Sequence, residues 1–252
     1  MTRWSIARPR TGVRAGVFLV VAGLAVAAGF TVLAGPAPAT AQEAHKPGEP
    51  HDPHDATSTH RFTGVEKWVK IFDDPGRDLW QKPARVVEAL GLKPGMVVAD
   101  LGAGTGYFMR HLSQAVAPGG IVLAIDTEAE MVAHLGERAK KENLDNTVPV
   151  LGLGDRPFLP AGRVDRVLIV DTFHHINDRL DYLGRLKRAL APGGRLVVID
   201  FHKKPLPVGP PPAHKLERQF VIDEVREAGW RLAKEETFLP YQYFLVFEPG
   251  SN

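Results

Sequence analysis

Residues 97–108 read VVADLGAGTGYF, and this stretch decides the fold expected of the chain. An apolar run ends in Asp100 and is followed at once by three glycines. They are Gly102, Gly104 and Gly106. Glycine adopts positive φ and lets a ligand approach backbone N–H groups, so the stretch is typical of a strand that ends in a ligand-binding turn. A dinucleotide-binding turn needs the pattern G-x-G-x-x-G, but Tyr107 holds its last place, which disfavours a nicotinamide-dependent oxidoreductase.

Turn signals divide the region after this stretch into alternating strands and helices. The sequence APGG occurs at 117–120 and at 191–194, each time between a helix-like segment and an apolar run. Continuous apolar runs such as RVLIV at 166–170 are typical of parallel strands that are buried on both faces. Strands are expected at 96–100, 121–126, 147–151, 165–171 and 195–201, with helices near 106–116, 128–141 and 178–190.

The end of the chain departs from this alternation. A proline-rich segment, KKPLPVGPPPAHK at 203–215, precedes a predicted helix at 217–228. Two apolar segments at 231–239 and 242–248 then lie close enough in sequence to pair as an antiparallel hairpin. We therefore predict an α/β fold with a doubly wound, Rossmann-like, seven-stranded sheet that is mostly parallel and ends in an antiparallel hairpin.

The first 41 residues read as a targeting segment. Residues 15–35 carry no charge, and four arginines precede them at positions 3, 8, 10 and 14. A signal peptide has an apolar core of roughly 7–15 residues and a spanning helix needs about 20, so residues 1–41 fit a signal peptide or an N-terminal membrane anchor. Ala39 and Ala41 supply a small-x-small cleavage site, and a later translation start is the remaining alternative. Arginines before the segment predict an exported domain, periplasmic or extracellular, or one anchored in the inner membrane and facing out.

Residues 42–60 are predicted to form a disordered linker rich in proline and histidine. Its histidines have no regular spacing and no paired acids, so no metal site is predicted. Residues 61–252 form the predicted globular domain, and 61–92 form its helical cap. Within the cap one helix ends at the DDPG turn and a second is expected from Asp78 to Leu90, with Gly91 as its C-terminal cap.

Composition excludes several kinds of chemistry. The 252 residues include no cysteine, which rules out disulfides and thiolate metal ligands. The net charge is only +2, and the arginines of the targeting segment supply more than that, so no nucleic-acid-binding face is expected. Asp126 ends the second predicted strand, twenty residues after Gly106, where a carboxylate can bind both hydroxyls of a ribose.

The stretches DLGAGTG at 100–106, AID at 124–126 and LKRALAPGGRLVVIDF at 186–201 together resemble the class I S-adenosylmethionine-dependent methyltransferases. The resemblance covers about residues 80–248 and implies S-adenosylmethionine as cofactor. It places the glycine loop under the methionine part of the cofactor, Asp100 near its amino group, and the last strand antiparallel beside the fifth. The cofactor-binding candidates are Asp100, Gly102, Gly104, Gly106, Asp126 for the ribose, Thr127, Met131 near the adenine, and Asp155.

One position departs from the family pattern. The family has an acid after the third strand that reads the adenine amino group, and alignment back from Val164 and Asp165 places Leu153 there. Asp155 lies two residues later. It is either a displaced adenine contact or an acid on a solvated turn beside Arg156.

The segment VDTFHHIND at 170–178 leaves the fourth predicted strand and offers Asp171, His174 and His175 as catalytic candidates. Methyl transfer from a sulfonium needs alignment more than covalent help, and a base only when the acceptor is protonated. The alternative is that one histidine packs or caps the following helix. We predict methyl transfer to a small-molecule or lipid acceptor, with a non-catalytic exported nucleoside- or lipid-binding module as the alternative; no oligomeric state is predicted.

Overall fold

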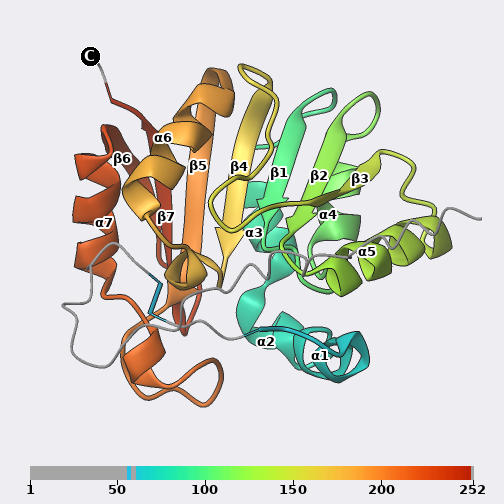
Figure 1. Cartoon of the computed structure of the whole chain (residues 1–252), viewed down its shortest axis with the longest axis horizontal. Coiled ribbons are helices and arrows are strands. Elements are labelled where there is room, and N and C mark those ends of the chain that lie inside the picture. The colour runs from blue at the N-terminus through green and yellow to red at the C-terminus, as the bar shows by residue number, and fades with distance from the viewer. Residues whose placement is uncertain (1–55, 58–60, 251–252) are drawn as a thin grey trace, which may run out of the picture. The chain divides into compact units, whose positions relative to one another are not determined.

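The computed structural model describes residues 56–57 and 61–250, which lie in one compact unit that spans Pro50–Asn252 (Figure 1). The predicted targeting segment lies outside the described residues, as does all of the predicted linker except Ala56 and Thr57. Within residues 56–57 and 61–250, no helix combines the length and apolar character needed to cross a membrane.

A seven-stranded sheet forms the centre of the domain, in the order β3-β2-β1-β4-β5-β7-β6. Strands β1 to β5 pair in parallel, whereas β7 runs antiparallel to β5 and to β6, which confirms the predicted fold and the terminal hairpin. The strands are β1 (Val97–Leu101), β2 (Ile121–Asp126), β3 (Thr147–Leu151), β4 (Val164–Val170), β5 (Leu190–Phe201), β6 (Trp230–Glu236) and β7 (Gln242–Pro249). Strand β5 starts five residues earlier than predicted, because Leu190 pairs with Val164 before the register shifts, and the APGG segment is therefore part of the strand.

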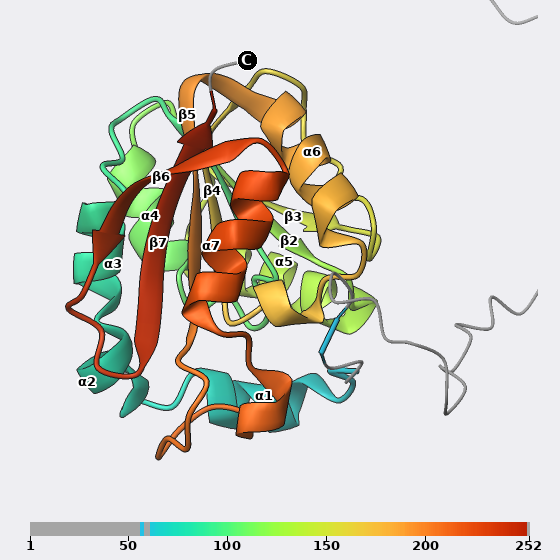
Figure 2. The ribbon, with the colours of Figure 1, turned by 90° about the vertical axis from the view of Figure 1, so that its left-hand side faces the viewer.

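Helices pack on both faces of the sheet (Figures 1 and 2). Apolar side chains of α3 (Pro83–Ala89) and α4 (Met109–Val116) share a core with Val98, Val122 and Leu168 on one face. On the other face, α6 (Arg179–Ala189) and α7 (Arg218–Glu227) pack on Val167, Ile169 and Leu196. Helix α5 (Ala129–Lys141) contacts β2 and β3. The alternation of side chains along buried strands thus gives each face of the sheet its own apolar core, and Leu135 of α5 belongs to a smaller third cluster.

Two short helices cross the carboxyl ends of the parallel strands, below the arrowheads in Figure 1. They are α1 (Val65–Phe72) and α2 (Arg77–Gln81). The prediction of a single helix from Asp78 to Leu90 is wrong, because the helix is interrupted at Lys82, which separates α2 from α3. Lys82 has φ +48° and precedes Pro83, whose ring disfavours helical backbone in the residue before it and suits the first turn of a new helix. The break lets α2 turn away from α3 over the strand ends.

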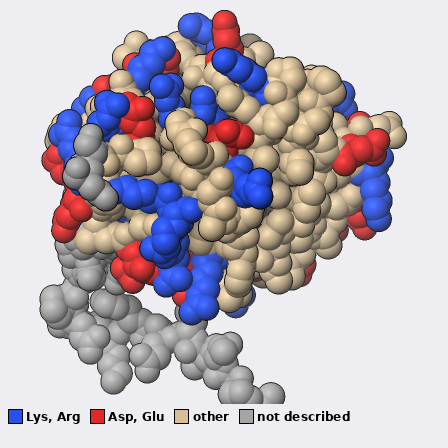
Figure 3. Space-filling model, turned by 90° about the horizontal axis from the view of Figure 1, so that it is seen from above, with Lys and Arg blue, Asp and Glu red and all other residues tan. Residues whose placement is uncertain are grey.

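The carboxyl edge also carries a 3-10 helix, η1 (Phe173–His175), and the proline-rich segment with η2 (Pro212–His214). Figure 3 shows the opposite edge of the domain, where basic and acidic side chains are mixed across the surface. Gly91 has φ +60° after α3 and confirms the predicted helix end.

Candidate active site

The glycine loop owes its sequence to both backbone conformation and close packing. Gly102, Gly104 and Gly106 have φ of +75°, +56° and +86°. A Cβ on Gly102 would lie 2.3 Å from Thr172 Oγ1, and one on Gly106 would lie 2.5 Å from Met109 Sδ. At Gly104 the nearest atom would be a ring carbon of Phe72, 3.5 Å away. The middle glycine therefore presents its backbone beneath α1, while the outer two allow the loop to pack.

Asp126 joins the second strand to this loop. Its Oδ2 accepts a hydrogen bond from Gly104 N at 2.8 Å, and its Oδ1 accepts one from Glu128 N at 3.0 Å. Burial raises the pKa of Asp126, and these backbone donors oppose the rise. The backbone of Thr127 adds a third donor, and the carboxylate stays partly exposed at the end of β2. A partly exposed carboxylate in this place can accept hydrogen bonds from the hydroxyls of a ribose.

Asp100, at the end of β1, is a buried carboxyl group with 3% exposure. Burial raises its pKa from 3.8 to about 7; the charge of Arg77 opposes the rise and that of Asp126 adds to it. No described residue donates a hydrogen bond to its carboxylate. A buried carboxyl in this state is stabilised by a cationic ligand, such as an amino group, more than by water.

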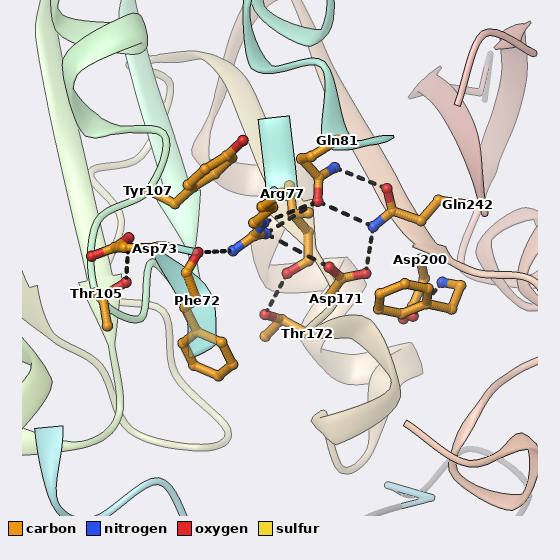
Figure 4. Close-up of polar contacts among 12 residues, drawn as sticks. Phe72, Asp73, Arg77, Gln81, Thr105, Tyr107, Asp171, Thr172, Asp200 and Gln242 are labelled. Carbon is orange, nitrogen blue, oxygen red and sulfur yellow. Dashed lines mark hydrogen bonds and ion pairs between the residues drawn. The ribbon is translucent and has the colours of Figure 1, made fainter. Parts of the chain in front are cut away.

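Arg77 brings α2 into the site, as Figure 4 shows. Its Nη1 donates to Phe72 O at 3.0 Å, and its Nε and Nη2 donate to Gln81 Oε1 at 3.3 and 3.1 Å. The guanidinium lies 4.0 Å above the ring of Tyr107, the residue after the third glycine. Three of its five N–H groups are thus used, which leaves one on each terminal nitrogen for an anionic group, and Nη2 also lies 3.8 Å from Asp171 Oδ2. No motif in the sequence marks this arginine.

Asp171 lies directly after β4 with φ +53°, an uncommon conformation for a residue other than glycine. Its Oδ1 accepts a hydrogen bond from Gln242 Nε2 at 2.7 Å, and its Oδ2 lies 3.8 Å from Arg77 Nη2 (Figure 4). Gln242 in turn accepts a hydrogen bond from Gln81 at 2.9 Å. Burial and the charge of Asp200 raise the pKa of Asp171 to about 7, whereas Arg77 lowers it. The group therefore titrates near neutral pH and is held by residues of α2 and β7.

His174 forms a buried pair with Asp200 of β5. The distance from Nδ1 to Asp200 Oδ2 is 2.8 Å, and the other Asp200 oxygen accepts a hydrogen bond from Phe201 N. Burial lowers the pKa of His174, but the Asp200 carboxylate outweighs it, so the pKa lies above its ordinary value. Thr57, in the predicted linker, donates its backbone N–H to His174 O at 2.9 Å. The ring of His175 packs instead on Phe62, with centroids 5.4 Å apart.

The remaining predicted site residues lie around the ends of β2 and β3. Thr127 is exposed, and Met131 is completely buried in α5. Asp155 is exposed and forms an ion pair with Arg156 at 3.2 Å, next to the exposed Leu153. Their roles toward a ligand stay predictions. Among the residues that the structure describes, no three His, Asp or Glu side chains are placed to hold a metal ion.

Comparisons with known proteins agree with this arrangement. Residues 99–198 match a family model described as a methyltransferase domain. A solved structure of a SAM-dependent methyltransferase from Aquifex aeolicus is 32% identical, with a TM-score of 0.69, and the match covers 74% of this chain and 98% of that one. Among curated proteins, the demethylmenaquinone methyltransferase of Lactococcus lactis is 34% identical over 149 residues, which cover 57% of this chain and 56% of the relative. A ubiquinone/menaquinone biosynthesis C-methyltransferase of Pseudomonas syringae is 31% identical over 126 residues, which cover 50% of this chain and 48% of the relative. The chain thus spans about half the length of these two curated relatives.

Proposed function

The chain belongs to the class I S-adenosylmethionine-dependent methyltransferases, and we propose that it transfers the methyl group to a lipophilic small molecule or a lipid. Family membership favours this enzymatic function over the non-catalytic binding module. The names of the two curated relatives support an acceptor with an apolar body, because those proteins are named for menaquinone and ubiquinone chemistry. The aromatic side chains of Trp80, Phe201 and Tyr241, which lie near one another at the carboxyl edge, suit the same kind of molecule.

The single observation that carries the donor site is the hydrogen bond between Gly104 N and Asp126. It holds a partly exposed carboxylate directly against the glycine loop, as binding of a nucleoside requires. S-adenosylmethionine supplies an electrophilic methyl group on its sulfonium sulfur. Asp126 would hold the ribose, the carboxyl group of Asp100 would face the amino group, and Arg77 would bind the carboxylate. These residues thus fit the amino group and the carboxylate of the methionine part.

Asp171 is the proposed proton acceptor. It lies next to Thr172, which packs on Gly102, so it leaves β4 beside the loop. A base works best when its pKa is close to the working pH, and the pKa of Asp171 is about 7. His174 is a positioning residue in this proposal, because its ring is held by Asp200 at the carboxyl ends of β4 and β5, close to Asp171 in the chain. His175 packs on Phe62 and has no assigned chemical role.

The location of the enzyme belongs to the same proposal. The uncharged segment 15–35 behind four arginines supports an exported domain or one tethered to a membrane. A tether would keep the domain near a lipophilic acceptor. N-terminal sequencing of the mature protein from fractionated cells tests this: a new terminus near residue 42 indicates cleavage, and an intact terminus in the membrane fraction indicates an anchor.

Calorimetry with S-adenosylhomocysteine, the reaction product, tests the donor site. The full chain in mild detergent is expected to bind it. Asp126→Ala is expected to weaken binding by at least tenfold, because a hydrogen bond to a charged group contributes about 1.5 kcal/mol or more and each 1.4 kcal/mol is about tenfold in affinity. Asp223→Ala is the matched control, because Asp223 is an exposed acid on α7. The proposal fails if the wild-type chain shows no binding, or if both variants bind alike.

A further inference from the structure

Lys215, at the end of the proline-rich segment, is a fully buried lysine. Among the described residues its ammonium donates one hydrogen bond, to Lys204 O at 2.9 Å, and it lies 5.5 Å from the ring centroid of Phe201. An ammonium group carries three N–H donors, and a buried charge is costly unless it is paired. Within the described chain, then, the hydrogen-bonding capacity of Lys215 is only partly used.

The hydroxyl group of Tyr243 is a second unused polar group in the same region. The side chain is 1% exposed, and its Oη has no hydrogen-bond partner among the described residues. Tyr243 pairs with Asp200 across β5 and β7, next to the end of β5 that Phe201 forms. A buried hydroxyl without a partner is costly, so it indicates either a site for a ligand oxygen or a defect in packing.

The end of β5 connects the two groups, because Lys215 lies 5.5 Å from the ring of Phe201 and Tyr243 pairs with the preceding residue, Asp200. Burial lowers the pKa of Lys215 and raises that of Tyr243; the charges of Asp200 and Asp171 oppose the first shift and add to the second. Both groups therefore lie at the carboxyl end of β5, the edge of the sheet that also carries the proposed base. Trp80 lies 5.7 Å from Phe201 and 6.1 Å from Tyr241 between ring centroids, which adds aromatic surface beside Phe201.

We propose that Lys215 and Tyr243 bind an anionic oxygen of the methyl acceptor, and that the acceptor is a phenol or enol whose ring lies against Trp80 and Phe201. The inference rests on the proposed function and narrows its acceptor class. On binding, the acceptor's O–H bond breaks, its proton passes to a carboxylate oxygen of Asp171, and the electron pair stays on the acceptor oxygen. The ammonium of Lys215 and the hydroxyl of Tyr243 then donate hydrogen bonds to that oxyanion, so both donors gain a partner. A neutral acceptor without such an oxygen leaves the hydroxyl of Tyr243 without a partner and the ammonium of Lys215 with only its bond to Lys204 O.

The test uses 4-nitrophenol, whose ionised form absorbs at longer wavelength than its neutral form. The full chain, in detergent and saturated with S-adenosylhomocysteine, is titrated with this probe at a pH where the free probe is mostly neutral. We expect binding to increase the absorbance of the ionised form, and we expect 4-nitroanisole, which has no ionisable oxygen, to bind at least tenfold more weakly.

Variants assign the effect to the two residues. Lys215→Met is expected to weaken probe binding by at least tenfold and to abolish the spectral change, whereas Lys215→Arg retains the charge and part of the binding. Tyr243→Phe is expected to weaken it severalfold. Lys203→Met is the control, since Lys203 is an exposed lysine of the same segment. S-adenosylhomocysteine affinity, measured in parallel, is expected to stay unchanged in all four variants.

The outcomes separate this inference from the proposed function. If the wild type binds S-adenosylhomocysteine but binds 4-nitrophenol no better than 4-nitroanisole, the oxyanion site is wrong and the donor site stands. The oxyanion site is also wrong if Lys215→Met and Tyr243→Phe both bind 4-nitrophenol as tightly as the wild type does. Should Lys215→Met fail to fold, Tyr243→Phe and Lys215→Arg decide the matter. Loss of S-adenosylhomocysteine binding by the wild type itself would contradict the proposed function instead.

Discussion

Replacement of Asp100 by asparagine is expected to stabilise the protein and to weaken donor binding at the same time. Burial raises the pKa of Asp100 from 3.8 to about 7. Each pKa unit is worth about 1.36 kcal/mol, so ionised Asp100 lowers the free energy of unfolding by up to about 4 kcal/mol at pH 8. Because the pKa is raised in the folded state, the protein has its full stability below about pH 4, where Asp100 is neutral in both states. It loses up to about 4 kcal/mol of the free energy of unfolding as the pH rises through the folded-state pKa of about 7. An asparagine side chain at this position would be neutral throughout and nearly the same shape.

Denaturant titration of the full chain in detergent, at pH 4 and at pH 8, measures the free energy of unfolding and hence this effect. Asp100→Asn is expected to match the wild type at pH 4 and to exceed it at pH 8 by up to about 4 kcal/mol, an upper value because part of the group's surroundings can relax. Calorimetry at pH 8 is expected to show S-adenosylhomocysteine binding weakened by about tenfold or more, because the amino group loses a charged acceptor. Asp223→Asn controls for loss of a surface charge. A variant that is no more stable than the wild type at pH 8, or that binds the product equally well, would refute the reasoning.

Three further predictions concern single side chains. Arg77→Met is expected to weaken S-adenosylhomocysteine binding by at least tenfold in calorimetry, because the ligand carboxylate loses its guanidinium; equal affinity would exclude Arg77 from the donor site. In wild-type pH profiles, kcat/KM is expected to rise about tenfold per pH unit below pH 7 and to level off above it, as Asp171 loses its proton, while Asp171→Asn gives a low, flat profile. Arg179→Met breaks a buried ion pair with Glu224, at 2.8 Å between Nε and Oε2, and is expected to lower the free energy of unfolding by about 3–5 kcal/mol without changing product affinity; an unchanged unfolding midpoint would contradict it.

The sheet could be predicted from the sequence because its signals are local. Apolar runs, three of them preceded by Pro-Gly turns, locate each strand within one residue, apart from the start of β5 and the end of β6, which comes three residues earlier than predicted. The contact between Asp126 and the glycine loop also follows from local signals. Both lie at the carboxyl ends of consecutive strands joined by one helix, and parallel strands joined in this way are usually neighbours.

Residues that reach the site across the fold could not be predicted in this way. Arg77 is separated from the glycine loop by α3 and β1. Its position depends on the interruption of the helix at Lys82, which results from the positive φ of Lys82 and from the proline that follows it. The pairing of His174 with Asp200 joins residues that are 26 positions apart. Neighbouring parallel strands β4 and β5 bring their ends together, but the sequence does not show which of two consecutive histidines turns inward. Lys215 lies in a segment whose composition predicts only a loop.

Arg77 joins the donor and acceptor sides of the proposed site into one electrostatic unit. Its positive charge opposes the effect of burial on both Asp100 and Asp171, two carboxyl groups with a pKa of about 7. Because the guanidinium is carried by α2, both acids depend on one short helix that lies over the strand ends. A ligand carboxylate bound to Arg77 would neutralise part of that charge, and the pKa of Asp171 would rise as a consequence. Donor binding would then make Asp171 a stronger base when it is ionised, so the two halves of the reaction are coupled through a residue that belongs to neither strand end.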